Sequence, residues 1–193
     1  MLLYGAFATH LTLALVGLHQ RHTLLLPPSE LLRIGFGLTI PLLQIGHVVS
    51  TRVAYSWYGE AAHYRRVIAN LASSGGTGWQ LALLAPGWLH GCMGLNLAFR
   101  HRAWYAPRRG WLIGAVVALP LLAAAGYWSM TRDVEALNLP AAQRVTPADP
   151  AQRRALGELR EHLLTGYFGL LALMLAARSV RDWRDGRRTR ATR

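Results

Sequence analysis

Five long stretches of the chain contain no acidic residue and no arginine, and their length limits the fold more than any other feature. They are Met1–Gln20, Ile34–Thr51, Val67–Phe99, Gly110–Thr131 and Leu163–Ala177. Roughly 20 predominantly apolar residues are enough for a helix to cross a bilayer. We therefore predict an all-α fold, a polytopic transmembrane helix bundle of about five spans. The last stretch is the shortest, so we expect its helix to begin earlier, near Leu156.

The charged residues fit a membrane protein as well. They make up 16% of the sequence, against about a quarter in a typical soluble domain. All 21 basic residues are arginines, and most of them cluster beside the apolar stretches. The clusters are Arg21 and Arg33; Arg100, Arg102, Arg108 and Arg109; and Arg178, Arg181, Arg184, Arg187, Arg188, Arg190 and Arg193. Because arginine-rich segments stay in the cytoplasm, these clusters predict membrane topology and no nucleic-acid partner. The N-terminus is then outside and the C-terminus cytoplasmic.

The same pattern divides the chain into two regions. We assign residues 1–181 to the transmembrane helical bundle. Residues 182–193 form a basic cytoplasmic tail, which we expect to lie on the anionic headgroups of membrane lipid. The fourth connection, Arg132–Arg160, is predicted to be a long loop. Pro27 and Pro28 are expected to end the first helix, and Ser29 to cap the second.

Three histidines lie deep within apolar stretches. His10, His47 and His90 are each several residues from the nearest charged side chain. Polar residues at membrane depth are costly and usually face the interior of a bundle, where they have a partner. Gly87 and Gly94 flank His90 at i−3 and i+4, so they leave room beside the imidazole for a wide, flat group.

A haem b explains these features together. A neutral imidazole ligates haem iron, and two histidines from facing helices form a low-spin electron-transfer centre. His10, His47 and His90 are therefore the candidate ligands of one or two haem irons. Arg52 is a candidate cation for a propionate or a quinone. In the cofactor-free alternative, these histidines form hydrogen bonds across helices, and Arg52 is an ordinary arginine of the membrane interface.

A quinone would need hydrogen-bonding groups near a haem. Gln44, His47 and Thr51 stand at i, i+3 and i+7, which keeps one face of the second span polar. The candidate quinone contacts are Gln44, Ser50, Thr51 and Tyr55, and each of them also has a structural interpretation. The single cysteine, Cys92, cannot form a disulfide within the chain and is expected to be a small buried side chain.

Several motifs resemble those of known haem proteins. "HVVSTR" (His47–Arg52) and "HGCMG" (His90–Gly94) resemble the haem-ligand segments of the cytochrome b membrane subunits of succinate dehydrogenase and fumarate reductase. The whole chain more closely resembles the cytochrome b-like membrane anchor of bacterial class III adenylate cyclases. The motifs that carry this second resemblance are "LLYGAFATH" (Leu2–His10), "HVVSTR" and "HGCMGLNLAFRHRAWY" (His90–Tyr105).

The resemblance implies a protein of the bacterial inner membrane that binds haem b and senses the redox state of the quinone pool. In that family the signal passes to a ferredoxin-like domain and a cyclase domain. The sequence lacks both domains and one histidine-bearing helix of the family, so separate cyclase, ferredoxin or missing-helix partners are expected. Asn96 replaces the second histidine of the family pattern "HGCIGLH". It is expected to form a hydrogen bond across helices or to contact a cofactor.

Two histidine pairings remain open. At about 1.5 Å of rise per residue, His10 and His90 lie roughly 12–15 Å from the cytoplasmic boundary and His47 roughly 20 Å. Depth therefore favours a His10–His90 pair, whereas the succinate dehydrogenase resemblance pairs His47 with His90. His90 belongs to both pairs.

The leading hypothesis is a haem b module that transfers electrons to and from quinones or reports their redox state. The alternative is a cofactor-free membrane anchor or assembly subunit, and a homodimer is a further candidate assembly. No residue set indicates catalysis by the chain itself. The apolar stretches contain no paired carboxylates, and the sequence has no Ser/His/Asp arrangement and no cluster of cysteines and histidines with metal-ligand spacing.

Overall fold

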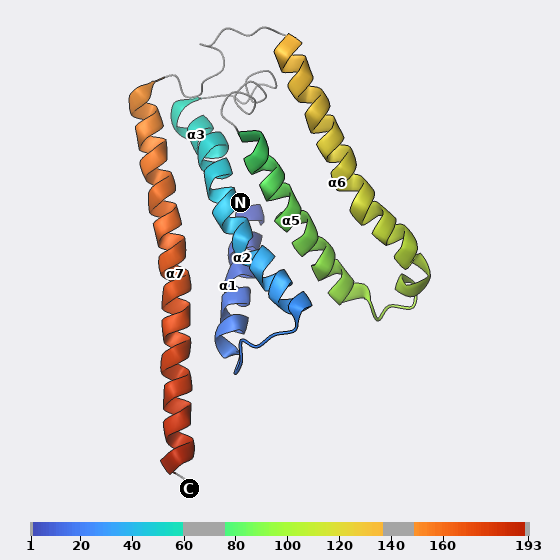
Figure 1. Ribbon diagram of the computed structural model, residues 1–193. Coiled ribbons are helices and arrows are strands. Elements are labelled where there is room, and N and C mark those ends of the chain that lie inside the picture. Colours follow the sequence, from blue (N-terminus) through green and yellow to red (C-terminus); the bar gives the residue numbers. More distant parts are fainter. Residues whose placement is uncertain (1, 60–75, 137–148, 192–193) are drawn as a thin grey trace. The chain divides into compact units, whose positions relative to one another are not determined.

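The computed structural model describes residues 2–59, 76–136 and 149–191, and every regular element in these ranges is helical. The elements are α1 (Leu2–Gln20), α2 (Pro28–Val48), the π-helix η1 (Val49–Val53), α3 (Ala54–Tyr58), α5 (Gly76–Phe99), α6 (Tyr105–Ala136) and α7 (Pro150–Ala191) (Figure 1). The prediction of an all-α chain is confirmed for these residues.

Four helical segments are long and apolar enough to cross a membrane. They are Leu2–Gln20, Pro28–Tyr58, Tyr105–Met130 and Pro150–Asp185. Their length and composition indicate a multi-pass membrane protein. The third predicted stretch corresponds to α5, whose 24 residues would extend over about 36 Å. Residues 67–75 of that stretch lie outside the described residues.

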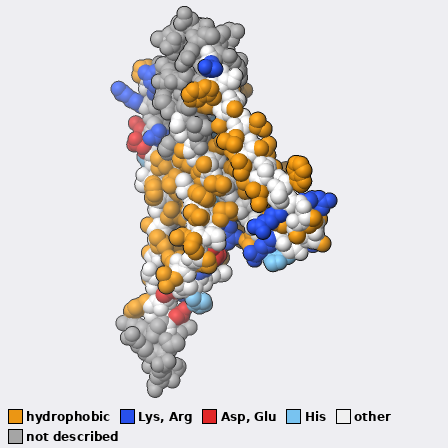
Figure 2. Space-filling model, turned by 45° about the vertical axis from the view of Figure 1, so that its right-hand side comes forward, with side chains coloured by type: hydrophobic (Ala, Val, Ile, Leu, Met, Phe, Trp, Pro, Cys, Tyr) orange, Lys and Arg blue, Asp and Glu red, His pale blue; other side chains and the backbone are white. Residues whose placement is uncertain are grey.

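Large apolar side chains are exposed along the helices. Trp111 and Leu122 of α6 are 85% and 68% exposed, and apolar side chains cover much of the visible helix surface in Figure 2. Arginine side chains gather at the turn between α5 and α6 in the same view. Contiguous apolar surfaces of this extent are rare on soluble monomers. A lipid environment accounts for them, because apolar side chains that contact hydrocarbon are removed from water.

The described chain forms two compact units. The first unit contains residues 1–27 and 164–193, and the second contains residues 28–163. In the first unit, arginines of α7 bind the end of α1. Arg181 donates hydrogen bonds to the carbonyl oxygens of His19 and Arg21, and Nε of Arg178 donates to that of Arg21 at 3.2 Å. The last carbonyls of a helix lack donors within the helix, so these guanidinium groups satisfy them.

The end of α1 corrects one sequence prediction. Helix α1 ends at Gln20, well before Pro27, so the prolines do not terminate it. Pro28 instead is the first residue of α2. Proline suits a first helical position because the amide hydrogen it lacks would have no partner there. Ser29 therefore lies inside the first turn of α2 and does not precede it.

In the second unit, α2 and α5 form the most extensive contact between helices, and α6 follows α5 through a short turn. Helix α2 continues through η1 into α3, which ends at Gly59 with φ of 68°. A small apolar core of Val49, Ala54 and Leu156 joins this region to the beginning of α7. The core therefore holds η1, which begins two residues after His47, against a second helix.

The prediction of a loop over Arg132–Arg160 is wrong at both ends. Helix α6 continues to Ala136, and α7 begins at Pro150. Residues 137–148 lie outside the described residues. The carboxylate of Asp149 accepts a hydrogen bond from the backbone N–H of Ala151 at 2.8 Å. An aspartate cap followed by proline is a strong helix start. It therefore begins α7 before Leu156, the residue near which we expected it to start.

Candidate functional site

The imidazole of His90 forms a hydrogen bond between two helices. His90 lies on α5 and is half-buried, and its Nδ1 lies 3.0 Å from the carbonyl oxygen of Arg33 on α2. A carbonyl oxygen can only accept a hydrogen bond, so Nδ1 carries the proton and donates it. In the neutral ring, the lone pair is then on Nε2. Contact with Arg33 thus selects one tautomer of His90.

Gly37 allows the ring of His90 to approach α2. A Cβ atom at Gly37 would lie 2.7 Å from Cε1 and 3.0 Å from Nδ1 of His90, which is closer than a side-chain carbon tolerates. Four residues later, Pro41 interrupts α2. Pro41 has no N–H to donate to the Gly37 carbonyl. Sequence reasoning missed Gly37, although a glycine one turn before a proline inside an apolar helix was a usable signal.

Gly87 and Gly94 differ from Gly37. A Cβ atom built at either position would meet no atom within 4 Å, apart from its own helix, in the part of the chain that the structure describes. Neither glycine is therefore required for a close helix contact here. They leave open surface on α5 beside His90, and whether a flat ligand lies there remains a prediction.

His47 is the second-last residue of α2, so it lies close to a change in helix type. Its carbonyl oxygen accepts hydrogen bonds from the hydroxyls of Thr51 at 2.6 Å and Ser50 at 3.2 Å. The π-helix η1 covers Val49–Val53, and the N–H of Ala54 donates to the carbonyl of Val49. Hydroxyls that bond backward to a helical carbonyl compete with the regular amide bond. The motif "HVVSTR" is thus a site of altered backbone, of a kind that is frequent at functional sites.

Gln44 lies one turn before His47. Its Oε1 is buried and has no hydrogen-bond partner within the described ranges. A buried acceptor without a partner is costly, so this oxygen is a point where a donor from a ligand or another group would stabilise the protein. Among the candidate quinone contacts, Gln44 therefore differs from Ser50 and Thr51, whose hydroxyls are bound to the His47 carbonyl.

Arg52 and Tyr55 lie together on the exposed side of this region. The guanidinium carbon of Arg52 is 5.9 Å from the centre of the Tyr55 ring, and both residues are exposed. This is a cation–π distance. The structure places these two candidates next to each other on an exposed surface.

His47 is part of α2, and His90 of α5 contacts α2 at a different height. His90 contacts α2 at Gly37, and ten residues separate Gly37 from His47 in the sequence. Ten residues correspond to about 15 Å along an α-helix. Two histidines that held one haem would lie at similar heights, so this arrangement does not favour the pairing of His47 with His90. His10 belongs to the first unit, where it is exposed, and its pairing with His90 remains a prediction.

The end of the third motif forms the turn between α5 and α6. The hydroxyl of Tyr105 donates a hydrogen bond to Oδ1 of Asn96 at 2.7 Å. Of the two roles expected for Asn96, the structure therefore contains the hydrogen bond between helices. Cys92 is a free cysteine of intermediate exposure, more open than the buried position expected for it.

Comparison with known proteins identifies no relative of the chain. No protein-family model, no curated protein and no solved structure matches the chain. The assignment of a function therefore depends on the site itself.

Proposed function

We propose that the chain is a haem b membrane module that exchanges electrons with the quinone pool or reports its redox state. The observation that carries the proposal is the bond from Nδ1 of His90 to the Arg33 carbonyl. Histidines that ligate metals usually donate their other ring nitrogen to a carbonyl or carboxylate, which fixes the ring and raises its basicity. His90 has that outer partner and the matching tautomer.

The proposal gives each candidate a role. His90 would hold the iron through Nε2, and His10 and His47 are the other candidate ligands. His47 would serve a second haem, if one is bound. A bound haem would supply one-electron transfer. The chain's own residues orient the imidazoles and place cations at the membrane edge, and Arg52 is the candidate cation.

A quinol site would lie near Gln44 in this proposal. Its buried Oε1 without a partner is suited to accept a hydrogen bond from a quinol hydroxyl. The hydroxyls of Ser50 and Thr51 support the backbone around His47, and their role is then indirect. Tyr55 and Arg52 would contact a headgroup or a quinone at the exposed edge.

The membrane topology belongs to the same proposal. With α5 as a fifth span, the chain would cross the bacterial inner membrane five times and place its basic C-terminus in the cytoplasm. A signal would then reach a cyclase, a ferredoxin or another membrane partner there. We assign no catalytic activity to the chain itself.

One observation also favours the alternative of a cofactor-free anchor. The bond between His90 and Arg33 and the contact with Gly37 would stabilise a helix pair without any ligand. An absorption spectrum separates the two functions. We expect chain purified from cells supplied with a porphyrin precursor to show a Soret band that shifts when dithionite is added.

Two variants make this test specific to the site. His90→Ala should remove most of the Soret absorbance and of the haem measured by pyridine haemochrome. His162→Ala, which changes an exposed histidine of α7, should retain both. Folded wild-type protein without iron porphyrin would refute the haem proposal and leave the anchor as the function.

A further inference from the structure

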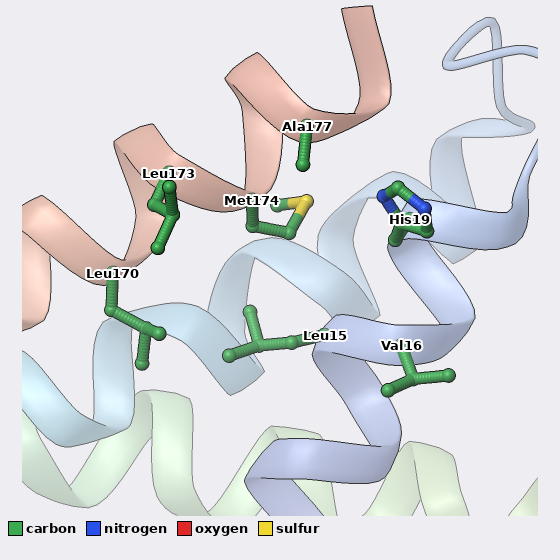
Figure 3. A pocket seen from close by; sticks show the side chains of 7 residues that line it. All are labelled: Leu15, Val16, His19, Leu170, Leu173, Met174 and Ala177. Atoms are coloured by element: carbon green, nitrogen blue, oxygen red, sulfur yellow. The ribbon is translucent and has the colours of Figure 1, made fainter. Parts of the chain in front are cut away.

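The first unit contains an open apolar groove between α1 and α7. Its walls are formed by Leu15 and Val16 of α1 and by Leu170, Leu173, Met174 and Ala177 of α7, and its volume is about 230 Å³. Figure 3 shows these side chains between the two helices, with His19 at the end nearest Ala177. Pockets that hold drug-sized ligands have volumes of roughly 300–1,000 Å³. The groove is smaller than these pockets and is open, so it would hold part of an extended acyl chain.

Positive charge gathers at the His19 end of this groove. Arg181 donates to the carbonyls of His19 and Arg21, so its guanidinium lies beside that end. Ala177, Arg181 and Arg184 stand at i, i+4 and i+7 and share one face of α7. The apolar wall of the groove thus continues along α7 into two arginines, of which Arg184 is exposed.

The local charge remains positive after the acidic residues are counted. Asp182 forms ion pairs with Arg181 at 2.5 Å and with Arg178 at 3.7 Å, and Asp185 is the other acidic residue of this region. The same region contains four arginines, which outnumber these two carboxylates. They are Arg21, Arg178, Arg181 and Arg184. An anionic group would therefore be attracted to this end of the groove.

We propose that the first unit binds one anionic phospholipid. Part of one acyl chain lies in the groove between Leu15 and Met174, and the phosphate lies at the His19 end near Arg181 and Arg184. The combination of an apolar groove and a cationic end inside one unit selects this ligand over a zwitterionic lipid, whose own cation offsets the attraction between its phosphate and the arginines. The proposal does not depend on haem, because none of its residues is a proposed iron ligand.

The test is a lipid titration of the detergent-solubilised full chain, followed by native mass spectrometry. Phosphatidylglycerol and phosphatidylcholine with the same acyl chains are the two probes. We expect one phosphatidylglycerol per chain, bound roughly ten-fold more tightly than phosphatidylcholine. Arg184→Gln should weaken phosphatidylglycerol binding about five-fold, which corresponds to about 1 kcal/mol for one cation near an anionic headgroup.

A matched pair of variants tests the groove itself. Leu173→Trp places a bulky ring in the groove and should reduce the bound phosphatidylglycerol several-fold. Leu175→Trp changes another exposed leucine, on the opposite face of α7, and should have no effect. Equal binding of the two lipids, no lipid bound to the wild type, or equal behaviour of the two tryptophan variants would overturn the proposal. If a tryptophan variant does not fold, the effect of Arg184→Gln on phosphatidylglycerol binding decides whether the proposal holds.

Discussion

Gly37 and His90 lie so close together that no side chain fits between them. The position of a Cβ atom on Gly37 is 2.7 Å from Cε1 of His90, and the same imidazole is bonded to the Arg33 carbonyl one turn earlier on α2. This contact sets how closely α2 and α5 approach each other. The bond to the Arg33 carbonyl fixes the tautomer of the histidine on which the proposed function depends.

We expect Gly37→Ala to displace the His90 ring and weaken its bond to Arg33. Inserting a methyl group into a tight contact costs about 1–3 kcal/mol, so the variant should unfold at lower denaturant in a mixed-micelle titration. If His90 ligates haem, the variant should also bind less haem.

Gly35→Ala is the matched control for this substitution. Gly35 lies on the same helix, and a Cβ atom there would meet nothing within 4 Å among the described residues, apart from its own helix. Alanine is favoured over glycine in a helix by about 0.5–1 kcal/mol, so this variant should be as stable as the wild type or slightly more stable. Equal destabilisation by both substitutions would contradict the importance of the Gly37–His90 contact.

We expect Thr51→Val to destabilise the π-helix after His47. Valine preserves the shape of the side chain and removes the hydroxyl that donates to the His47 carbonyl at 2.6 Å. The loss of one hydrogen bond costs about 0.5–1.5 kcal/mol, which should raise amide hydrogen exchange in residues 49–54 by roughly three- to ten-fold.

Thr39→Val serves as its control, because the Thr39 hydroxyl makes the same type of bond to the Gly35 carbonyl at 2.8 Å within the regular part of α2. A carbonyl in a regular α-helix keeps its amide partner, so we expect a smaller change near Gly35. Identical changes in the two variants would show that the hydroxyl of Thr51 has no special role in η1.

We expect Arg178→Gln to weaken the first unit. The Arg178 side chain is largely buried, and its Nε donates to the carbonyl of Arg21 beyond the end of α1. Hydrogen bonds that involve a charged group contribute about 1.5–3 kcal/mol, so the denaturant midpoint should fall.

Arg184→Gln, measured in detergent without anionic lipid, is the appropriate control for Arg178→Gln. It removes the same charge from an exposed position on the same helix, and it should leave the midpoint unchanged. A fall of the same size in both variants would mean that net charge, and not the contact with α1, determines the stability of this unit.

The sequence alone determined the helical class and most of the membrane-spanning segments. Uninterrupted apolar stretches such as Gly110–Thr131 form helices because a backbone in lipid must satisfy its hydrogen bonds within its own segment. The start of α7 was also encoded locally, since Asp149 and Pro150 form a regular cap. The charges of both signs in that region led us to predict a loop there instead.

Only the tertiary structure decided which groups meet. Nothing in the local pattern indicates that His90 bonds to the carbonyl of Arg33, that its ring needs Gly37, or that Arg178 and Arg181 bind the end of α1. Each of these contacts depends on the rotation and the relative height of two helices, which many side chains set together. The formation of a helix depends mainly on its own residues, whereas its partners depend on packing between segments distant in the sequence.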